Sequence, residues 1–294
     1  MRNLGISPDA RGSRLPWPWL DRARRFSWLR AALLGSLLTP GLVLLALLGD
    51  GAMGAEPWKA ATREAGSWAL IALLFSLAVT PLRWIAEWPK AATLRRMVGL
   101  VALGYGLLHL VLYTGHLGWD VFAVTGEIAR RLYLTLGFGV LLGLGALGWT
   151  STDGWQARLG RRWKGLHRLV YPLAALAVLH AFLQSKSQAN DAVLMAGLLL
   201  WLMAWRQLSG RWRADAMALA GLALGAAIGA ALVEWAWYAA ATALPAWRIM
   251  AANLDVAAGL RPAQIVLLAG LGVVVCRGVA LAAASRGRTP RIRA

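Results

Sequence analysis

Residues 165–184 read GLHRLVYPLAALAVLHAFLQ, an apolar stretch long enough to form a helix that crosses a membrane. Such a helix needs about 20 residues to cross the roughly 30 Å hydrocarbon core of a bilayer. Two of the four histidines of the chain, His167 and His180, fall within this stretch. An ionisable side chain inside a membrane is costly and usually functional. The stretch therefore predicts a membrane-spanning helix that carries part of a site.

The rest of the chain repeats this apolar pattern. Of its 294 residues, 59% are hydrophobic and 15% are charged, and the mean hydropathy is +0.56. These values exclude an ordinary water-soluble domain. We predict an all-α fold, a polytopic transmembrane helical bundle of about eight spans, because lipid leaves backbone groups no partner outside their own helix. The spans are expected at 31–48, 67–83, 97–117, 132–149, 167–184, 191–205, 216–240 and 263–283.

The distribution of charge predicts the topology. The net charge is +18, and 24 of the 31 Lys and Arg residues lie in the two tails and in the segments after the second, fourth and sixth spans. The four remaining connecting segments hold the other 7. This alternation is the positive-inside pattern, which predicts a multi-pass membrane protein with both termini in the cytoplasm. The basic composition therefore needs no nucleic-acid partner.

Three segments are expected along the chain. A basic cytoplasmic tail (1–30) precedes a six-helix transmembrane core (31–210) that holds all four histidines. An extension (211–294) adds two helices and a basic tail. The single cysteine, Cys276, excludes an internal disulfide, a CxxCH haem attachment and a cysteine-ligated iron–sulfur cluster. Any haem would have to be held by histidine.

The extension carries a small-residue ladder and one acid within a span. Gly221, Gly225 and Gly229 recur at intervals of four, which lets another helix approach closely, so we expect them to pack against the core or a second copy. Glu234 has two interpretations. It is either an interfacial residue paired with water or Arg248, or a functional acid inside the membrane.

The histidines suggest a haem site. His109 and His180 each lie about 12 or 13 residues into outward-running spans, so a rise of ~1.5 Å per residue places them at nearly one depth. Two imidazoles at one depth can hold a haem iron from both sides, although each could instead be a hydrogen-bonded structural residue. His116 lies near the outer end of its span and either contacts a partner or faces water.

A second, inner site is less complete. His167 lies at the cytoplasmic end, where Arg95 or Arg96 stands at the matching depth instead of a histidine. A straight helix would set His167 and His180 about 140° apart, which disfavours two haems on one face. Pro172 between them can kink the helix, or His167 can lie in an entry turn.

Four stretches of the chain resemble the MsrQ family, formerly called YedZ, which belongs to the ferric-reductase-like transmembrane group. They read SLAVTPLRW (76–84), LRRMVGLVALGYGLLHLVLY (94–113), GEIARRLYLTLGF (126–138) and TSTDGWQARLGRRWKGLHRLVYPLAALAVLH (150–180). The resemblance implies haem b, one or two copies, bound through iron to residues matching His109, His167 and His180. Arg95 stands where the related oxidases have a further histidine, and it could neutralise a haem propionate or a flavin phosphate. The family also implies FMN, to which no residue is matched.

The resemblance implies electron transfer as the function. Electrons would come from a quinol or a cytoplasmic flavin reductase and pass to a periplasmic molybdopterin-containing catalytic subunit that repairs oxidised methionine. Sulfoxide reduction would occur in that partner, and no catalytic residue is assigned here. One alternative is a ferric, metal or oxygen reductase membrane component, and another is a cofactor-free transporter or scaffold.

The division into core and extension is testable by truncation. A chain stopped after Asp215 should still insert, because its topology signals are local, and it should still bind haem, because every histidine is retained. The measurement is haem per protein in the truncated and full-length forms. An inserted truncation without haem would show that the extension completes the site.

Overall fold

The computed structural model describes residues 17–20, 25–185, 188–255 and 259–286, and its helices are joined by turns and loops, with one isolated bridge, Leu20 to Phe26, and no strand among the described residues. The long helices are α1 (Trp28–Gly49), α2 (Pro57–Ile85), α3 (Arg95–His116), α5 (Leu132–Trp149), α8 (Val170–Ser185), α9 (Asn190–Gln207), α10 (Ala216–Ala241) and α12 (Pro262–Arg286). The short ones are η1 (Pro89–Thr93), α4 (Val121–Arg130), α6 (Asp153–Leu159), α7 (Arg161–His167), η2 (Gly210–Ala214), α11 (Ala246–Ala251) and η3 (Ala252–Leu254). Most of the two predicted basic tails lies outside the described residues.

The predicted polytopic helical bundle is confirmed. Seven segments of the described chain are long and apolar enough to cross a membrane: α1, α2, α3, α5, the segment Arg161–Ser185, α10 and α12. The sixth predicted span, 191–205, coincides with α9, which has 18 residues but falls outside that set. Its ends explain this, since Asn190, Asp191, Arg206 and Gln207 lie within the helix itself.

One predicted boundary was wrong by ten residues, at the start of α2. Pro57 occupies the first helical turn, where its missing N–H costs nothing, and the following KAATREA residues favour a helix. The added turns are too polar to be recognised as part of an apolar span. They matter because they bring Thr62 and Gly66 beside α3.

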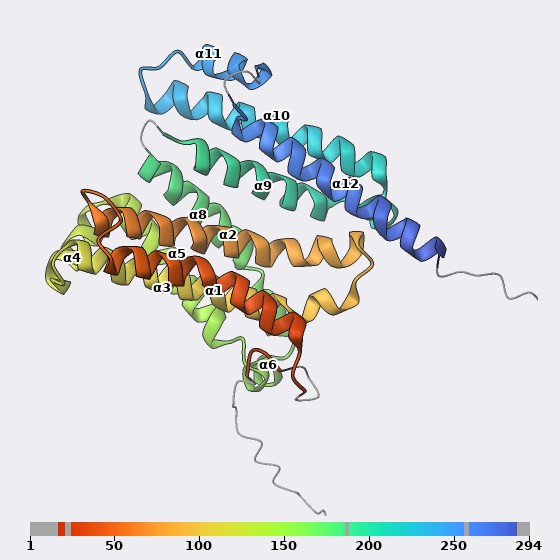
Figure 1. Ribbon diagram of the computed structural model, residues 1–294, viewed down its shortest axis with the longest axis horizontal. Helices are drawn as coiled ribbons and strands as arrows, with labels where there is room; N and C mark the ends of the chain where they lie inside the picture. The colour runs from red at the N-terminus through yellow and green to blue at the C-terminus, as the bar shows by residue number, and fades with distance from the viewer. Residues whose placement is uncertain (1–16, 21–24, 186–187, 256–258, 287–294) are drawn as a thin grey trace, which may run out of the picture.

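The long helices form one bundle in which α9 is central (Figure 1). It packs on α2 and α8 on one side and on α10 and α12 on the other. Figure 1 also separates the two ends: α1 begins near α6 at one, and α4 and α11 lie at the other. The basic connections after α2, α5 and α9 thus belong to the same end. That this end is cytoplasmic stays a prediction of the charge pattern.

Tyr105 of α3 fixes α1 by entering its hydrogen-bond ladder. The hydroxyl accepts from the Gly41 N–H at 2.8 Å and donates to the Leu37 carbonyl at 2.7 Å. In an undisturbed helix these two backbone groups would bond to each other. Because Tyr105 lies one turn before His109, this contact anchors the part of α3 that carries the histidine.

Two arginines from the C-terminal half donate to carbonyls of α2 that have no donor within that helix. In a helix the Leu77 carbonyl would bond to the N–H of residue 81, but Pro81 has none. Arg206 of α9 donates to that carbonyl at 2.9 Å. Its charge also lies 5.0 Å from the centre of the Tyr171 ring. The carbonyl that Pro81 exposes thus holds α9 against α2.

Arg277 of α12 plays a similar role at the end of α2. It donates to the Ile85 carbonyl at 3.3 Å and to the Ala214 carbonyl at 3.0 Å, and it pairs with Glu87 at 2.7 Å. Ile85 is the last residue of α2, so its carbonyl has no donor within the helix. The extension is therefore hydrogen-bonded to the core.

The predicted glycine ladder contributes one contact. A methyl at Gly229 would lie 3.0 Å from Leu200 of α9, but none of the described atoms lies within 4 Å of such a methyl at Gly221 or Gly225. The close approach of α10 and α12 occurs instead at Gly270, where a methyl would lie 2.5 Å from the Ala223 side chain. Glycines spaced four residues apart do not by themselves show which face of a helix packs against a neighbouring helix.

The proposed Glu234–Arg248 pair was wrong. Glu234 is fully buried and pairs with Arg261 at 2.5 Å, and Asn253 donates to its other oxygen at 2.8 Å. Arg248 instead stacks on Trp247. Three segments of the extension, α10, η3 and the start of α12, thus meet at a buried carboxylate.

The role assigned to Arg206 can be tested by a double-mutant cycle. Replacing Arg206 by Leu should destabilise the bundle by about 1–3 kcal/mol, the cost of a buried carbonyl without a donor. In a Pro81→Ala background the backbone can supply the missing N–H, so the loss should be clearly smaller. Denaturant unfolding in detergent measures both.

Arg211→Leu is the matched control, because Arg211 is exposed and contacts Trp212. If Arg206→Leu lowers the free energy of unfolding equally in the wild-type and Pro81→Ala backgrounds, Arg206 does not stabilise the bundle by donating to the carbonyl that Pro81 leaves without a donor.

Candidate functional site

His109 is held in place by the neighbouring helix. Its ring projects from the middle of α3, and its Nδ1 lies 2.8 Å from the backbone carbonyl oxygen of Thr62 in α2. A carbonyl oxygen only accepts, so Nδ1 carries the proton and donates. The Nε2 atom is therefore the unprotonated nitrogen, which is the form that binds a metal.

His180 repeats this arrangement on the other side of the site. It lies on α8, and its Nδ1 is 2.7 Å from the carbonyl oxygen of Tyr133 in α5. In both cases 47 residues separate the histidine from the residue whose carbonyl it contacts. The α2–α3 hairpin and the α5–α8 hairpin thus each carry one imidazole whose Nδ1 is hydrogen-bonded to a backbone carbonyl.

The structure brings these two imidazoles together. The ring centres of His109 and His180 lie 6.3 Å apart, and the ring planes are at 88°. Metal–imidazole bonds are about 2 Å long, and the ring centre lies about 1 Å beyond the nitrogen, so one metal ion between two rings needs centres about 6 Å apart. The pair therefore fits a single iron held from both sides.

His167 lies apart from this pair. It is the last residue of α7, its ring centre is 3.9 Å from that of Trp163, and its Nε2 is buried without a hydrogen-bond partner among the described residues. The expected irregularity between His167 and His180 is present, but it is a break between α7 and α8 that comes before Pro172. Pro172 itself lies in the first turn of α8. The straight-helix angle of about 140° therefore does not apply.

Arg95 and Arg96 have different surroundings. Arg96 pairs with Asp153 at 2.5 Å, which ties the start of α3 to the start of α6. Arg95 is exposed, lies close enough to His167 for their charges to interact, and makes no side-chain hydrogen bond or ion pair with the described part of the chain. Of the two arginines considered for the inner site, Arg95 is the one available to bind an anionic group.

The other candidate ligands do not gather. His116 is exposed at the end of α3, with its ring 6.4 Å from Tyr113. Across the described residues no three His, Cys, Asp or Glu side chains form a group that could hold a metal. A metal here would have to bring most of its ligands with it, as haem iron does.

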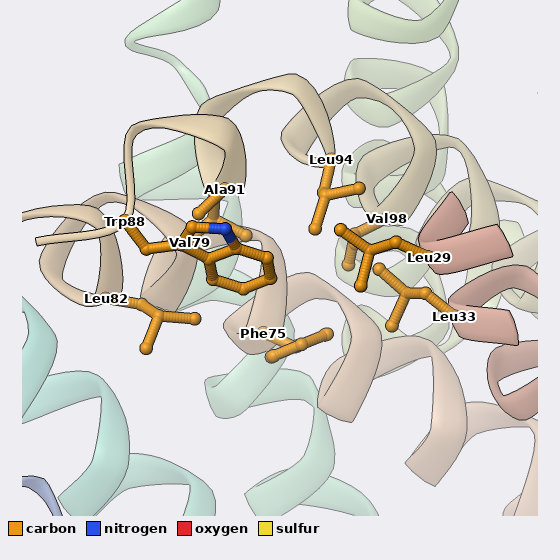
Figure 2. Close-up of a pocket in the computed structure, with 9 residues that line it drawn as sticks. All are labelled: Leu29, Leu33, Phe75, Val79, Leu82, Trp88, Ala91, Leu94 and Val98. Atoms are coloured by element: carbon orange, nitrogen blue, oxygen red, sulfur yellow. The ribbon is translucent and has the colours of Figure 1, made fainter. Parts of the chain in front are cut away.

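Two cavities lie away from the histidines. One, of about 90 Å³, is lined only by apolar residues and by Trp88, as Figure 2 shows. A more open groove of about 520 Å³ runs between α1 and α3 past Tyr105. Neither is lined by a histidine or an ionised side chain, so neither offers ligands for a metal.

Sequence reasoning identified the histidines but missed their partners. Thr62 and Tyr133 act through backbone carbonyls, which no side-chain pattern reveals. A signal was present in the equal spacing of 47 residues, but it has meaning only once the helix pairs are known.

The central part of the chain is similar to known proteins. Residues 65–178 match the family described as "Ferric reductase like transmembrane component". A "Protein-methionine-sulfoxide reductase heme-binding subunit MsrQ" from Rhodospirillum rubrum is 46% identical over 158 residues, covering 53% of this chain and 76% of that protein. The MsrQ subunit of Xanthomonas axonopodis pv. citri is 42% identical over 159 residues, covering 54% and 73%. No solved structure matches.

The paired histidines predict a clear effect of mutation. Replacing His109 or His180 by Ala removes one of two facing ligands, so haem bound at this site should be lost or converted from a low-spin to a high-spin form. The measurement is haem content and absorption spectrum of each purified variant. His116→Ala is the control, since its ring is exposed at the end of α3, and a wild-type spectrum in all three variants would refute the assignment.

Proposed function

This chain belongs to the MsrQ family, and from that membership and the paired imidazoles we propose that it binds haem b between His109 and His180 and carries electrons across the inner membrane. The observation that carries the proposal is the 6.3 Å spacing of two rings whose Nδ1 atoms are both occupied. Only the Nε2 atoms remain to act as ligands. A merely structural histidine pair has no need to leave both of these nitrogens unprotonated.

The residues of the chain hold and shield the group. Haem, when bound, supplies a one-electron carrier within a core of roughly 30 Å that electrons do not cross efficiently without one. The Thr62 and Tyr133 carbonyls fix the tautomer and rotation of the ligands. The apolar helices around them exclude water, which limits side reactions of the reduced carrier.

A second redox group is proposed at the inner end. The buried Nε2 of His167 has no partner, and Arg95 lies near it. A second haem would use His167 as a ligand and Arg95 as the partner of a propionate, whereas FMN would use the arginine for its phosphate. Both put a carrier nearer the basic end of the bundle.

The two ends suggest the direction of transfer. A quinol or a cytoplasmic flavin reductase would donate at the basic end. A periplasmic molybdopterin-containing subunit would accept at the end formed by α4 and α11, and sulfoxide reduction would take place there. The rival function, a metal or oxygen reductase, is favoured by the ferric-reductase-like match over residues 65–178. A cofactor-free transporter or scaffold would leave the close pairing of the two imidazoles without a purpose.

The test combines a spectrum with electron transfer. Purified chain should show a Soret band that shifts on reduction, and the reduced haem should be reoxidised when the molybdopterin-containing subunit and a methionine sulfoxide are added together. The same subunit without sulfoxide is the control. Absence of a Soret band would remove the haem proposal, and reoxidation by ferric chelates or oxygen but not by the subunit would favour the rival.

A further inference from the structure

The two histidine-bearing hairpins share a second feature, a glycine beside each imidazole. Gly66 comes four residues after Thr62 in α2, and Gly137 comes four residues after Tyr133 in α5. In a helix the carbonyl of residue i points toward the N–H of residue i+4, so a side chain at i+4 flanks that carbonyl. Both histidines reach their carbonyls at turns where this flanking side chain is missing.

The distances show that the glycines are required for the approach. A methyl at Gly66 would lie 2.8 Å from His109 Nδ1 and 3.1 Å from its Cε1. A methyl at Gly137 would lie 2.6 Å from His180 Cε1 and 2.8 Å from its Nδ1. Ordinary contacts between carbon atoms are about 3.5–4.0 Å, so either methyl would push the ring away. The ring cannot move away freely, because moving it breaks the hydrogen bond between Nδ1 and the carbonyl.

We propose that Gly66 and Gly137 are positioning residues for the two haem ligands. Each leaves one carbonyl open and lets one imidazole lie against its helix, so that Nδ1 donates and Nε2 is left to act as a ligand. The inference rests on the proposed function, because it concerns the haem ligands. It adds to it the residues that make room for the two rings, whose planes are at 88°.

The glycines therefore also influence the redox potential. A hydrogen bond from Nδ1–H to a carbonyl makes the imidazole a stronger donor to the metal. Stronger donation favours the ferric form and lowers the midpoint potential. A methyl at either glycine would weaken that bond, so the midpoint potential should rise, while the histidine itself is still present.

Single alanine substitutions test this with a control in the same helix. Gly66→Ala and Gly137→Ala should each raise the midpoint potential in a redox titration and shift the low-spin ferric EPR signal, which depends on the angle between the ligand planes. Gly139→Ala should match wild type. Gly139 lies about 200° around α5 from Gly137, and a methyl there meets none of the described atoms within 4 Å.

Wild-type potential and EPR signal in both glycine variants would overturn the proposal. If the variants do not fold, the EPR signal of the wild-type protein tests the orientation of the two rings. Near-perpendicular ligand planes give a strongly anisotropic signal. A rhombic signal, which parallel planes produce, would contradict the orientation. Wild-type protein without bound haem would instead refute the proposed function. The two failures are thus distinguishable.

Discussion

The structure depends on a hydrogen bond from an imidazole Nδ1–H to the backbone of a neighbouring helix. In lipid no water replaces a missing partner, so a polar ring that points its Nε2 inward must satisfy Nδ1 within the protein. Thr62 and Tyr133 do this for His109 and His180. The polar first turns of α2 are needed for the same reason, since Thr62 lies in them.

The same need for hydrogen-bond partners explains how the C-terminal helices are attached to α2. Pro81 and the end of α2 leave backbone carbonyls without a donor, and Arg206 and Arg277 donate to them from α9 and α12. Charged side chains in a membrane bundle are thereby used as hydrogen-bond donors to the backbone. The C-terminal helices, which lie outside the ferric-reductase-like match, are held to it by these polar contacts as well as by apolar packing.

Sequence predicted the spans well because apolar length is a local property. It also predicted that His109 and His180 face each other, since depth follows from counting residues along two helices of the same direction. It considered Arg248 as a partner of Glu234, which instead pairs with Arg261, and it did not show which glycine of the ladder meets another helix, because both depend on how helices rotate about their axes. The contact between Gly137 and His180 was not predicted for the same reason.

The repeated hairpin also affects how the protein is made. His180 is synthesised 71 residues after His109, which at about 5–20 residues per second is a delay of several seconds. During that time the α2–α3 hairpin has its own hydrogen bond and can insert as a finished unit, but it carries only one of the two paired histidines. If haem binds between His109 and His180 as proposed above, its loading has to wait for the second hairpin, and membrane insertion and cofactor capture are then separate steps in biogenesis.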